Sequence, residues 1–391
     1  MKDYFALKNK FIELNNIVKS RDDICTPMDC VELMVNYIPN ELWFRENLKF
    51  LDPCCGYGNF PAYLKTKVSS DFIYCNELSF ERYNKCKELL NLKNITNQDF
   101  FEFKNKETFD LIIANPPYSG GGNKNRSISN EFIKHSLSLL KDKGYLCFIT
   151  PNNWMSYNNN NTTLKALLDN GSFLVIDNDV KKYFKGVGSS FTVFVWQKGV
   201  FNHKTFVKNN YIIKDEQFVS IPKDIKFLPL YLSNDILSIF KKCLSLDRNT
   251  FNYRCDLHRT TQKSKISDTK ELNFVYETIH TPSKTCYSTF KQDIYDKYLV
   301  IIPLSTYFKP YIKHNVNVTQ SVGYVAFDTE QEAKDFKNIL DLDYVKVIVN
   351  LTRYGNFNNI MVLKHLKFDK NIYFTNDEIY ILNEIVKNLK H

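Results

Sequence analysis

A short proline-rich segment, Asn115-Pro116-Pro117-Tyr118, directly follows the apolar run at 109–114. Two consecutive prolines restrict the backbone and remove two N–H donors, so carbonyl groups there are available as acceptors beside the Asn115 amide oxygen. An aromatic ring next to such acceptors can stack on a flat base. The segment is therefore suited to hold an exocyclic amino group by both of its hydrogens. A proline-rich turn without any chemistry is the alternative interpretation.

Acidic residues and glycines upstream of this segment follow successive apolar runs. The segment LDPCCGYGNF places Asp52 at the end of one run, with Gly56 in the turn behind it, where a Cβ would hinder close approach of a ligand. Glu77 ends the next run, where a carboxylate can bind ribose hydroxyls. Asp99 is placed after a third run, where it can accept from an adenine amino group. Each feature alone is ordinary, and a G-x-G turn is often only structural, but together they predict a nucleoside-type ligand.

Strands and helices that alternate along the first 200 residues would bring these groups together. The expected buried strands are 48–52, 71–77, 109–114, 145–150, 173–177 and 191–197. Apolar residues at helical spacing predict two amphipathic helices, one with Met28, Val31, Met34, Val35 and Ile38, the other with Phe132, Ile133, Ser136, Leu137 and Leu140. This alternation predicts a doubly wound, mostly parallel α/β sheet covered on both faces. Ligands bind such sheets at the carboxyl ends of the strands.

The pattern is less regular beyond residue 200. The run at 298–304 predicts a strand, and the segments 330–348 and 377–389 predict helices. We therefore expect two domains, an α/β domain at 1–200 and an α+β domain at 201–391.

Composition narrows the class of protein. Of the 391 residues, 43% are hydrophobic and 24% are charged, which predicts a packed globular core. No apolar run approaches the roughly 18 residues of a membrane span, and the first ten residues lack the apolar stretch of a secretory signal, so a cytoplasmic protein is expected. The ten cysteines lack zinc-site spacing, which predicts reduced thiols and no metal. The net charge of +9 is compatible with a polyanionic partner or simply with a solvated surface.

The order of these motifs resembles that of the γ-type amino-DNA methyltransferases of restriction-modification systems. The segments that carry the resemblance are Cys25-Thr26-Pro27, LDPCCGYGNF, NELS, NQDFFEF, ANPPY and SSFTVFVWQK, within residues 22–200, with a weaker likeness at 324–352. The resemblance implies a Rossmann-like S-adenosylmethionine-dependent methyltransferase domain followed by a target-recognition domain. It also implies an adenine-specific enzyme that methylates the N6 amino group in double-stranded DNA by base flipping, as the modification component of a type II system. Asparagine at the first position of the catalytic motif favours adenine over cytosine.

The resemblance assigns roles to individual residues. The cofactor S-adenosylmethionine would contact Thr26, Asp52, Cys54 and Cys55 at its methionine end, Glu77 at its ribose, and Asp99 and Phe100 at its adenine ring. Gly56 would be a further cofactor-binding residue. The catalytic residues would be Asn115, Pro116, Pro117 and Tyr118, with Tyr118 and Phe191 stacking on the target base. Tyr57 departs from the pattern, because a small residue is usual in this turn.

Partners and alternatives follow from the same comparison. We expect a monomer whose partners are double-stranded DNA and a separately encoded cognate restriction endonuclease. The loop at 119–130, with Lys124 and Arg126, would close over the target strand. Three alternatives remain open: an RNA or ribosomal N6-adenine or guanine methyltransferase, a protein-glutamine N5-methyltransferase, which also carries N-P-P-Y, and a non-catalytic DNA-binding protein on the same fold. No residue of 201–391 can be assigned to a base.

Overall fold

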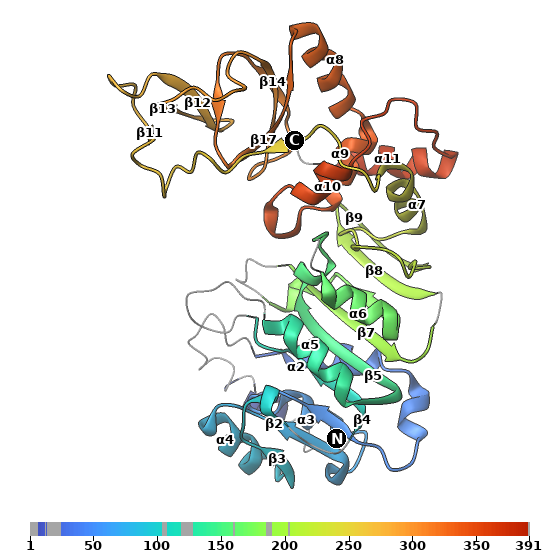
Figure 1. Cartoon of the computed structure of the whole chain (residues 1–391). Coiled ribbons are helices and arrows are strands. Elements are labelled where there is room, and N and C mark those ends of the chain that lie inside the picture. The colour runs from blue at the N-terminus through green and yellow to red at the C-terminus, as the bar shows by residue number, and fades with distance from the viewer. Residues whose placement is uncertain are drawn as a thin grey trace. The chain divides into compact units, whose positions relative to one another are not determined.

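The chain forms two compact units (Figure 1). The computed structural model describes residues 7–11, 13, 25–103, 108–118, 128–158, 161–184, 190–201 and 204–389. The first unit comprises Met1–Met155 and Asn160–Phe227, and the second comprises Ser156–Asn159 and Leu228–His391. The first unit thus continues to residue 227 rather than to the expected boundary at 200, because a further hairpin extends its sheet.

A nine-stranded sheet forms the centre of the first unit, in the order β3-β2-β1-β4-β5-β7-β6-β8-β9. Its strands are β1 Phe50–Asp52, β2 Ile73–Asn76, β3 Asn94–Thr96, β4 Phe109–Ala114, β5 Leu140–Pro151, β6 Gly171–Asp177, β7 Phe191–Lys198, β8 Thr205–Tyr211 and β9 Ile213–Val219. The strands from β3 to β5 are parallel, whereas β7 runs antiparallel to both of its neighbours. The doubly wound, mostly parallel sheet is therefore confirmed.

Helices alternate with these strands along the chain. They are α2 Met28–Asn36, α3 Asn59–Leu64, α4 Phe80–Leu90, α5 Ile128–Leu139 and α6 Thr162–Asn170, with short 3-10 turns at Asn40–Phe44, Ser70–Phe72, Phe100–Glu102, Asn152–Met155 and Lys181–Tyr183. The crossovers β1–α3–β2 and β4–α5–β5 each connect strands that run parallel in the sheet. Figure 1 shows α5 beside α6, and α5 packs on β5 while α6 packs on β6.

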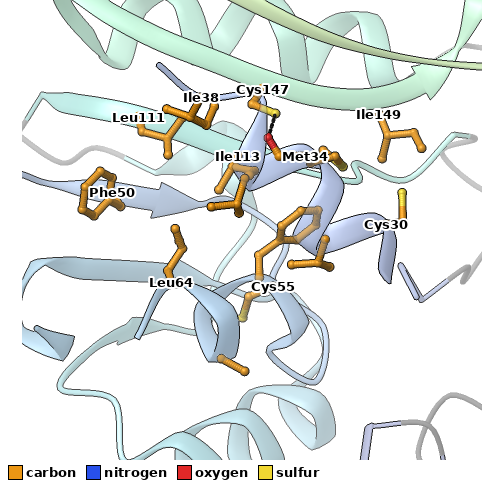
Figure 2. Packing of buried hydrophobic residues seen from close by; sticks show 14 of the residues in the cluster. Cys30, Met34, Ile38, Phe50, Cys55, Leu64, Leu111, Ile113, Cys147 and Ile149 are labelled. Atoms are coloured by element: carbon orange, nitrogen blue, oxygen red, sulfur yellow. Dashed lines mark hydrogen bonds between the residues drawn. The ribbon is translucent and has the colours of Figure 1, made fainter. Parts of the chain in front are cut away.

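The regularly spaced apolar residues of α2 pack into the core beside the sheet. Met34 on α2 packs with alternate residues of β4 and β5, such as Ile113 and Cys147 (Figure 2). The Cys147 thiol donates a hydrogen bond to the Met34 carbonyl at 3.6 Å. Each such fully buried apolar side chain contributes about 1.5–3 kcal/mol through its removal from water. The packing fixes α2, and with it the residues that precede the helix.

The second unit contains two four-stranded sheets, β10-β17-β14-β15 and β11-β13-β12-β16. The strands are β10 Asn252–Tyr253, β11 Ile266–Ser267, β12 Tyr276–Thr281, β13 Lys284–Ser288, β14 Tyr298–Pro303, β15 Tyr311–Lys313, β16 Asn317–Val318 and β17 Val322–Phe327. The helices are α7 Asn234–Cys243, α8 Glu330–Leu340, α9 Asp343–Leu351, α10 Ile360–His365 and α11 Asn376–Asn388, with a 3-10 turn at Tyr354–Asn356. Helices α7, α9 and α11 pack on one another, whereas α8 packs on β14, β15 and β17, so this unit is α+β.

The region expected to be helical at 330–348 is helical, but it is divided into two helices. Helix α8 ends at Leu340, and Leu342 has an extended conformation with ψ of 145° before α9 begins. The capping box of Thr329 and Glu332 fixes the start of α8. The break lets the two helices pack independently, α8 on the sheet and α9 on α11.

The second unit also takes in a segment from the middle of the first unit's sequence. Residues 156–158 follow the 3-10 turn after β5 and belong to the second unit. The Asn359 side-chain amide donates to the Tyr157 carbonyl at 3.2 Å and to the Ser156 hydroxyl at 3.4 Å. The Tyr157 ring lies 5.7 Å from the His365 ring, between centroids. The chain therefore passes between the two units more than once.

Parts of two expected loops lie outside the described residues. The loop at 119–130 is described only from residue 128, where α5 begins, so that Lys124 and Arg126 are not included. Of the Asn-rich stretch 157–161, residues 159 and 160 are likewise not described. No disulfide bond links the cysteines of the described ranges. None of the helices in the described ranges has both the length and the apolar character of a membrane span.

Candidate functional site

A cavity of about 360 Å³ lies at the carboxyl ends of β1, β2 and β4 in the first unit. Successive strands are added toward one edge of the sheet from β1 to β3 and toward the other edge from β4 onward, and α/β sheets bind ligands at such switch points. The volume falls in the range of small-molecule sites. The predicted residues that line it are Thr26, Cys54, Cys55, Gly56, Glu77, Asp99, Phe100, Asn115, Pro116, Pro117 and Tyr118. Asp52 and Phe191 do not line the cavity, although both lie close to residues that do.

Glu77 at the end of β2 holds the glycine turn in place. Its Oε2 atom accepts a hydrogen bond from the Gly56 amide at 2.8 Å, and its Oε1 atom accepts from the Ser79 amide at 2.9 Å and from Arg82 Nε at 3.0 Å. The side chain of Glu77 is only 4% exposed. Gly56 has a φ of +56°, which favours glycine. Since a carboxylate has about four acceptor positions, Oε2 can still accept from a ligand in the cavity.

Asn76 connects the loops at the same edge of the sheet. The sequence alone did not identify it as a site residue. Its amide donates to the Pro53 carbonyl at 3.2 Å and to the Gln98 carbonyl at 3.1 Å, while its side-chain oxygen accepts from the Thr96 hydroxyl at 2.8 Å. Its own carbonyl accepts from the Cys55 amide at 2.9 Å. This buried side chain therefore joins the loops after β1 and β3. The only sequence signal for it is a polar residue at the end of an apolar run.

Asp52 lies beneath the turn with one carboxylate oxygen satisfied. Its Oδ1 atom accepts from the Cys54 amide at 3.2 Å, whereas Oδ2 is buried with no hydrogen-bond partner among the described residues. The residue is 1% exposed, and this burial raises the pKa of its carboxyl well above the usual range. An unsatisfied buried oxygen is costly, so the fold maintains here an acceptor that its own residues do not use.

The first prediction concerns this carboxyl. Because its pKa is higher in the folded than in the unfolded state, its contribution to stability is present below the unfolded-state value of about 3.9 and is lost as the pH rises toward the folded-state value. The amide of Asp52→Asn does not titrate. We expect the ligand-free variant to melt roughly 2–4 °C above the wild type at pH 8. We expect a smaller difference at pH 5. Calorimetric melting temperatures that differ equally at both pH values would contradict this.

An apolar wall closes the cavity at the end of β3. The Phe100 ring stacks on Phe132 of α5, with 4.9 Å between centroids, and its edge meets His135 at 4.7 Å. Burial lowers the pKa of His135, which favours the neutral imidazole. The Asp99 carboxylate accepts from the Phe101 amide at 2.9 Å and begins a 3-10 turn there. The wall thus combines a flat ring surface with an acidic rim.

The proline segment lies at the end of β4 with its asparagine hydrogen-bonded. The Tyr118 hydroxyl donates to Asn115 Oδ1 at 2.6 Å, and the Cys54 thiol donates to the Asn115 main-chain carbonyl at 3.6 Å. The Tyr118 ring contacts the Phe191 ring at 5.2 Å with a tilt of 42°. Phe191 is 2% exposed and also contacts Phe184 at 5.1 Å. Phe191 therefore packs against the Tyr118 ring and does not itself line the cavity.

Burial is the largest influence on the pKa of the Cys54 thiol and of the Tyr118 hydroxyl. It raises the pKa of the Cys54 thiol, to which the nearby Asp52 and Glu77 carboxylates also contribute. It likewise raises the pKa of the Tyr118 hydroxyl. Both groups therefore stay protonated and act as hydrogen-bond donors. Within the described residues, no group of three or more His, Cys, Asp or Glu side chains is arranged to hold a metal ion.

Comparison with known proteins finds relatives that match much of the region around the cavity. Residues 42–184 match the model of the Eco57I restriction-modification methylase family. The Type II methyltransferase M.HincII of Haemophilus influenzae is 25% identical over 279 residues, which cover 64% of this chain and 52% of that protein. The release factor glutamine methyltransferase of Clostridium botulinum is 24% identical over 174 residues, 37% of this chain and 61% of that protein.

Solved structures extend the likeness to both units. A nuclease-deletion mutant of the Type ISP restriction-modification enzyme LlaGI, solved with a DNA substrate mimic, covers 97% of this chain with a TM-score of 0.59 at 13% identity, over 56% of its own length. At that identity the likeness concerns the fold. The chain spans about half the length of the curated methyltransferases it matches. Residues 42–184 are therefore similar to the Eco57I restriction-modification methylases, and the first unit has the fold of an S-adenosylmethionine-dependent methyltransferase.

Proposed function

We propose that this protein is a site-specific DNA methyltransferase that transfers a methyl group from S-adenosylmethionine to the N6 amino group of adenine in double-stranded DNA. The observation that carries the proposal is the position of Asn115-Pro116-Pro117-Tyr118, which lines the same cavity as the glycine turn and Glu77. In this proposal the protein is the modification component of a type II restriction-modification system. A cognate endonuclease would be separately encoded, and the second unit would read the target sequence.

The donors and acceptors of the cavity fit S-adenosylmethionine. The free acceptor position of Glu77 suits a ribose diol, and the ring of Phe100 with the Asp99 rim suits an adenine. Thr26, which lines the cavity, would serve the methionine end, and the buried, unpartnered Oδ2 atom of Asp52 lies behind the cavity-lining Cys54. The cofactor supplies an electrophilic methyl group on a positively charged sulfur.

The acceptors of the catalytic segment would activate the amino group. An adenine amino nitrogen is a poor nucleophile because its lone pair is delocalised into the ring. The Asn115 side-chain oxygen and the Pro116 carbonyl would each accept one amino hydrogen, which favours a tetrahedral nitrogen with a localised lone pair. The thiol of Cys54 stays protonated, so no covalent enzyme intermediate is invoked. The rate would come from positioning and from preorganised dipoles.

A base within a duplex must leave the stack to enter this cavity. Unstacking costs a few kcal/mol, and stacking on the Tyr118 ring would return about 1–3 kcal/mol. In the structure, Tyr118 faces Phe191 and its hydroxyl occupies Asn115 Oδ1. An entering base would therefore take over, or share, the acceptor that Tyr118 uses.

A protein-glutamine methyltransferase is the second candidate, since the Clostridium botulinum relative matches 37% of the chain. The match to the Type II methyltransferase M.HincII covers 64% of the chain, and the fold of LlaGI, solved with a DNA substrate mimic, covers 97%, including the second unit. A catalytic domain alone does not account for that second unit. This difference in extent favours DNA as the substrate.

Mass spectrometry of nucleosides tests the proposed function. The protein is incubated with S-adenosylmethionine and either unmethylated AT-rich duplex DNA, RNA or a glutamine-containing peptide. We expect N6-methyladenine in the duplex DNA only. N4-methylcytosine would keep the mechanism and overturn the choice of base. Methylation of RNA or of the peptide alone would overturn the DNA substrate.

The second prediction separates the ring of Tyr118 from its hydroxyl. Tyr118→Phe keeps the stacking ring and removes the donor on Asn115, so we expect the KM for DNA to fall about threefold with kcat within about threefold. Tyr118→Ala removes the ring, and we expect kcat/KM to fall roughly 10- to 100-fold. Steady-state kinetics on one duplex substrate measures both. Equal losses in the two variants would mean that the hydroxyl itself is required.

A further inference from the structure

Cys54 connects the loop after β1 to the catalytic segment after β4. Its amide donates to Asp52 Oδ1 at 3.2 Å, and its thiol donates to the Asn115 carbonyl at 3.6 Å. The two strands are parallel neighbours, with Leu51 paired to Ile112, so their carboxyl ends lie at the same edge. One residue thus contacts both a predicted cofactor residue and the first residue of the catalytic motif.

The chemistry of this thiol is that of a donor. Burial is the largest cause of its raised pKa, and the carboxylates of Asp52 and Glu77 add to it. A thiol held protonated is a weak nucleophile and a weak metal ligand. It keeps its S–H group, however, and the acceptor within reach is the Asn115 carbonyl.

The carbonyl that Cys54 contacts belongs to the peptide between Asn115 and Pro116. Proline has no N–H and a restricted φ, so no hydrogen bond of its own amide can orient this peptide. The remaining freedom is the ψ rotation of Asn115, and the thiol limits that rotation by holding the carbonyl oxygen. The same rotation sets where the Pro116 carbonyl points relative to the Asn115 side chain. A weak S–H bond at this position therefore acts on both acceptors at once.

We propose that Cys54 is a positioning residue that orients the Asn115–Pro116 acceptors relative to the cofactor loop. The proposal rests on the function proposed above, since it assigns Cys54 to the same site. Cys54 does not contact the reacting atoms in this role. It acts by maintaining the geometry of the acceptor pair.

The core provides a matched control. The Cys147 thiol donates to the Met34 carbonyl at the same distance of 3.6 Å, and Figure 2 shows this bond in the packed cluster between α2 and β5. Cys147 is fully buried and does not line the cavity. Cys147→Ala therefore removes an equivalent bond, with its packing, at a position outside the proposed machinery.

The test compares the wild type with three variants, Cys54→Ala, Cys54→Ser and Cys147→Ala. The rate of methyl transfer is measured in single-turnover experiments at saturating DNA and cofactor. The affinity for the cofactor is measured by calorimetry. We expect Cys54→Ala to lower the transfer rate about tenfold, with the cofactor Kd changed less than about twofold. Cys54→Ser keeps a hydroxyl donor, so its transfer rate is expected to be at least about threefold higher than that of Cys54→Ala. Cys147→Ala is expected to lower the melting temperature and to keep the wild-type rate. An unchanged rate in Cys54→Ala, or a loss confined to cofactor affinity, would overturn the proposal.

A second measurement does not depend on activity. The side-chain amide of Asn115 gives a ¹⁵N resonance that is identified by its absence in Asn115→Ala. In the cofactor-free protein we expect this resonance to shift or broaden in Cys54→Ala, to stay near its wild-type position in Cys54→Ser, and to stay unchanged in Cys147→Ala. A wild-type resonance in Cys54→Ala would overturn the positioning role. If the wild type methylates no DNA, the proposed function fails, and this spectrum still tests the link from Cys54 to Asn115.

Discussion

Replacement of Asn115 by alanine is expected to lower the rate of methyl transfer by about 10³-fold at saturating DNA and cofactor. The variant removes the side-chain oxygen that would accept one amino hydrogen in the transition state, and the loss of one such preorganised group costs about 10²–10³ in rate. Most of the cofactor's expected contacts, with Glu77, Asp52 and Phe100, stay in place. We therefore expect cofactor affinity within about threefold of the wild type. Single-turnover transfer and calorimetric titration measure the two effects separately.

A matched asparagine tests whether this loss is specific. Asn170 at the end of α6 donates to the Ala166 carbonyl at 2.8 Å and is exposed outside the cavity. Asn170→Ala should transfer methyl groups at the wild-type rate. An Asn115→Ala variant that keeps more than about a tenth of the wild-type rate would mean that Asn115 is not the essential acceptor. The loss of cofactor binding together with the rate would point to a collapsed site.

Substitution of Glu77 is expected to have the largest effect on cofactor affinity. Its carboxylate accepts from the Gly56 and Ser79 amides and pairs with Arg82, so Glu77→Ala leaves three donors without their acceptor. Hydrogen bonds to a charged group contribute about 1.5–3 kcal/mol each. The glycine turn loses its support, and the expected ribose acceptor is lost with it. We expect the Kd for S-adenosylmethionine to rise at least about 100-fold.

Two further variants keep this prediction testable if Glu77→Ala folds poorly. Glu77→Gln preserves the shape and one acceptor oxygen, and we expect its Kd to rise about tenfold or more with a smaller loss of melting temperature. Glu81, in the first turn of α4, is exposed, and Glu81→Ala is expected to bind like the wild type. A wild-type Kd in Glu77→Gln would contradict a role for the carboxylate in cofactor binding.

The sheet's centre was predictable because its strands are short, apolar and buried on both faces. The runs at 109–114 and 191–197 correspond to β4 and β7, almost every residue of which is buried. The edge strands were not. Strand β3, at one edge, is three residues long with one buried residue. Strand β8, next to the other edge strand β9, alternates mostly between buried and partly buried residues. The β8–β9 turn is also atypical, since Ile212 has a φ of +66° where glycine or asparagine is usual.

The residues of the cavity were predictable from strand order, whereas the contacts among them were not. Residues that follow parallel strands must meet at one edge, which is why Glu77 and Asn115 line the same cavity. The orientation of Tyr118 depends on Phe191, and that contact arises from pairing of β7 with β5. The role of Asn76 depends on loops after two different strands. Such long-range contacts leave no local pattern in a single sequence.

The path of the chain between the two units bears on how the second unit can be exchanged between relatives. Residues 156–158 belong to the second unit, where Asn359 bonds to Ser156 and Tyr157, yet they are encoded within the first. A recombination event that replaces everything after residue 227 would change the residues that contact 156–158. Residues 156–158 themselves would stay unchanged. Chimeras that also replace residues 156–158 would keep those hydrogen bonds matched. The second unit is therefore encoded as two separate pieces of the gene.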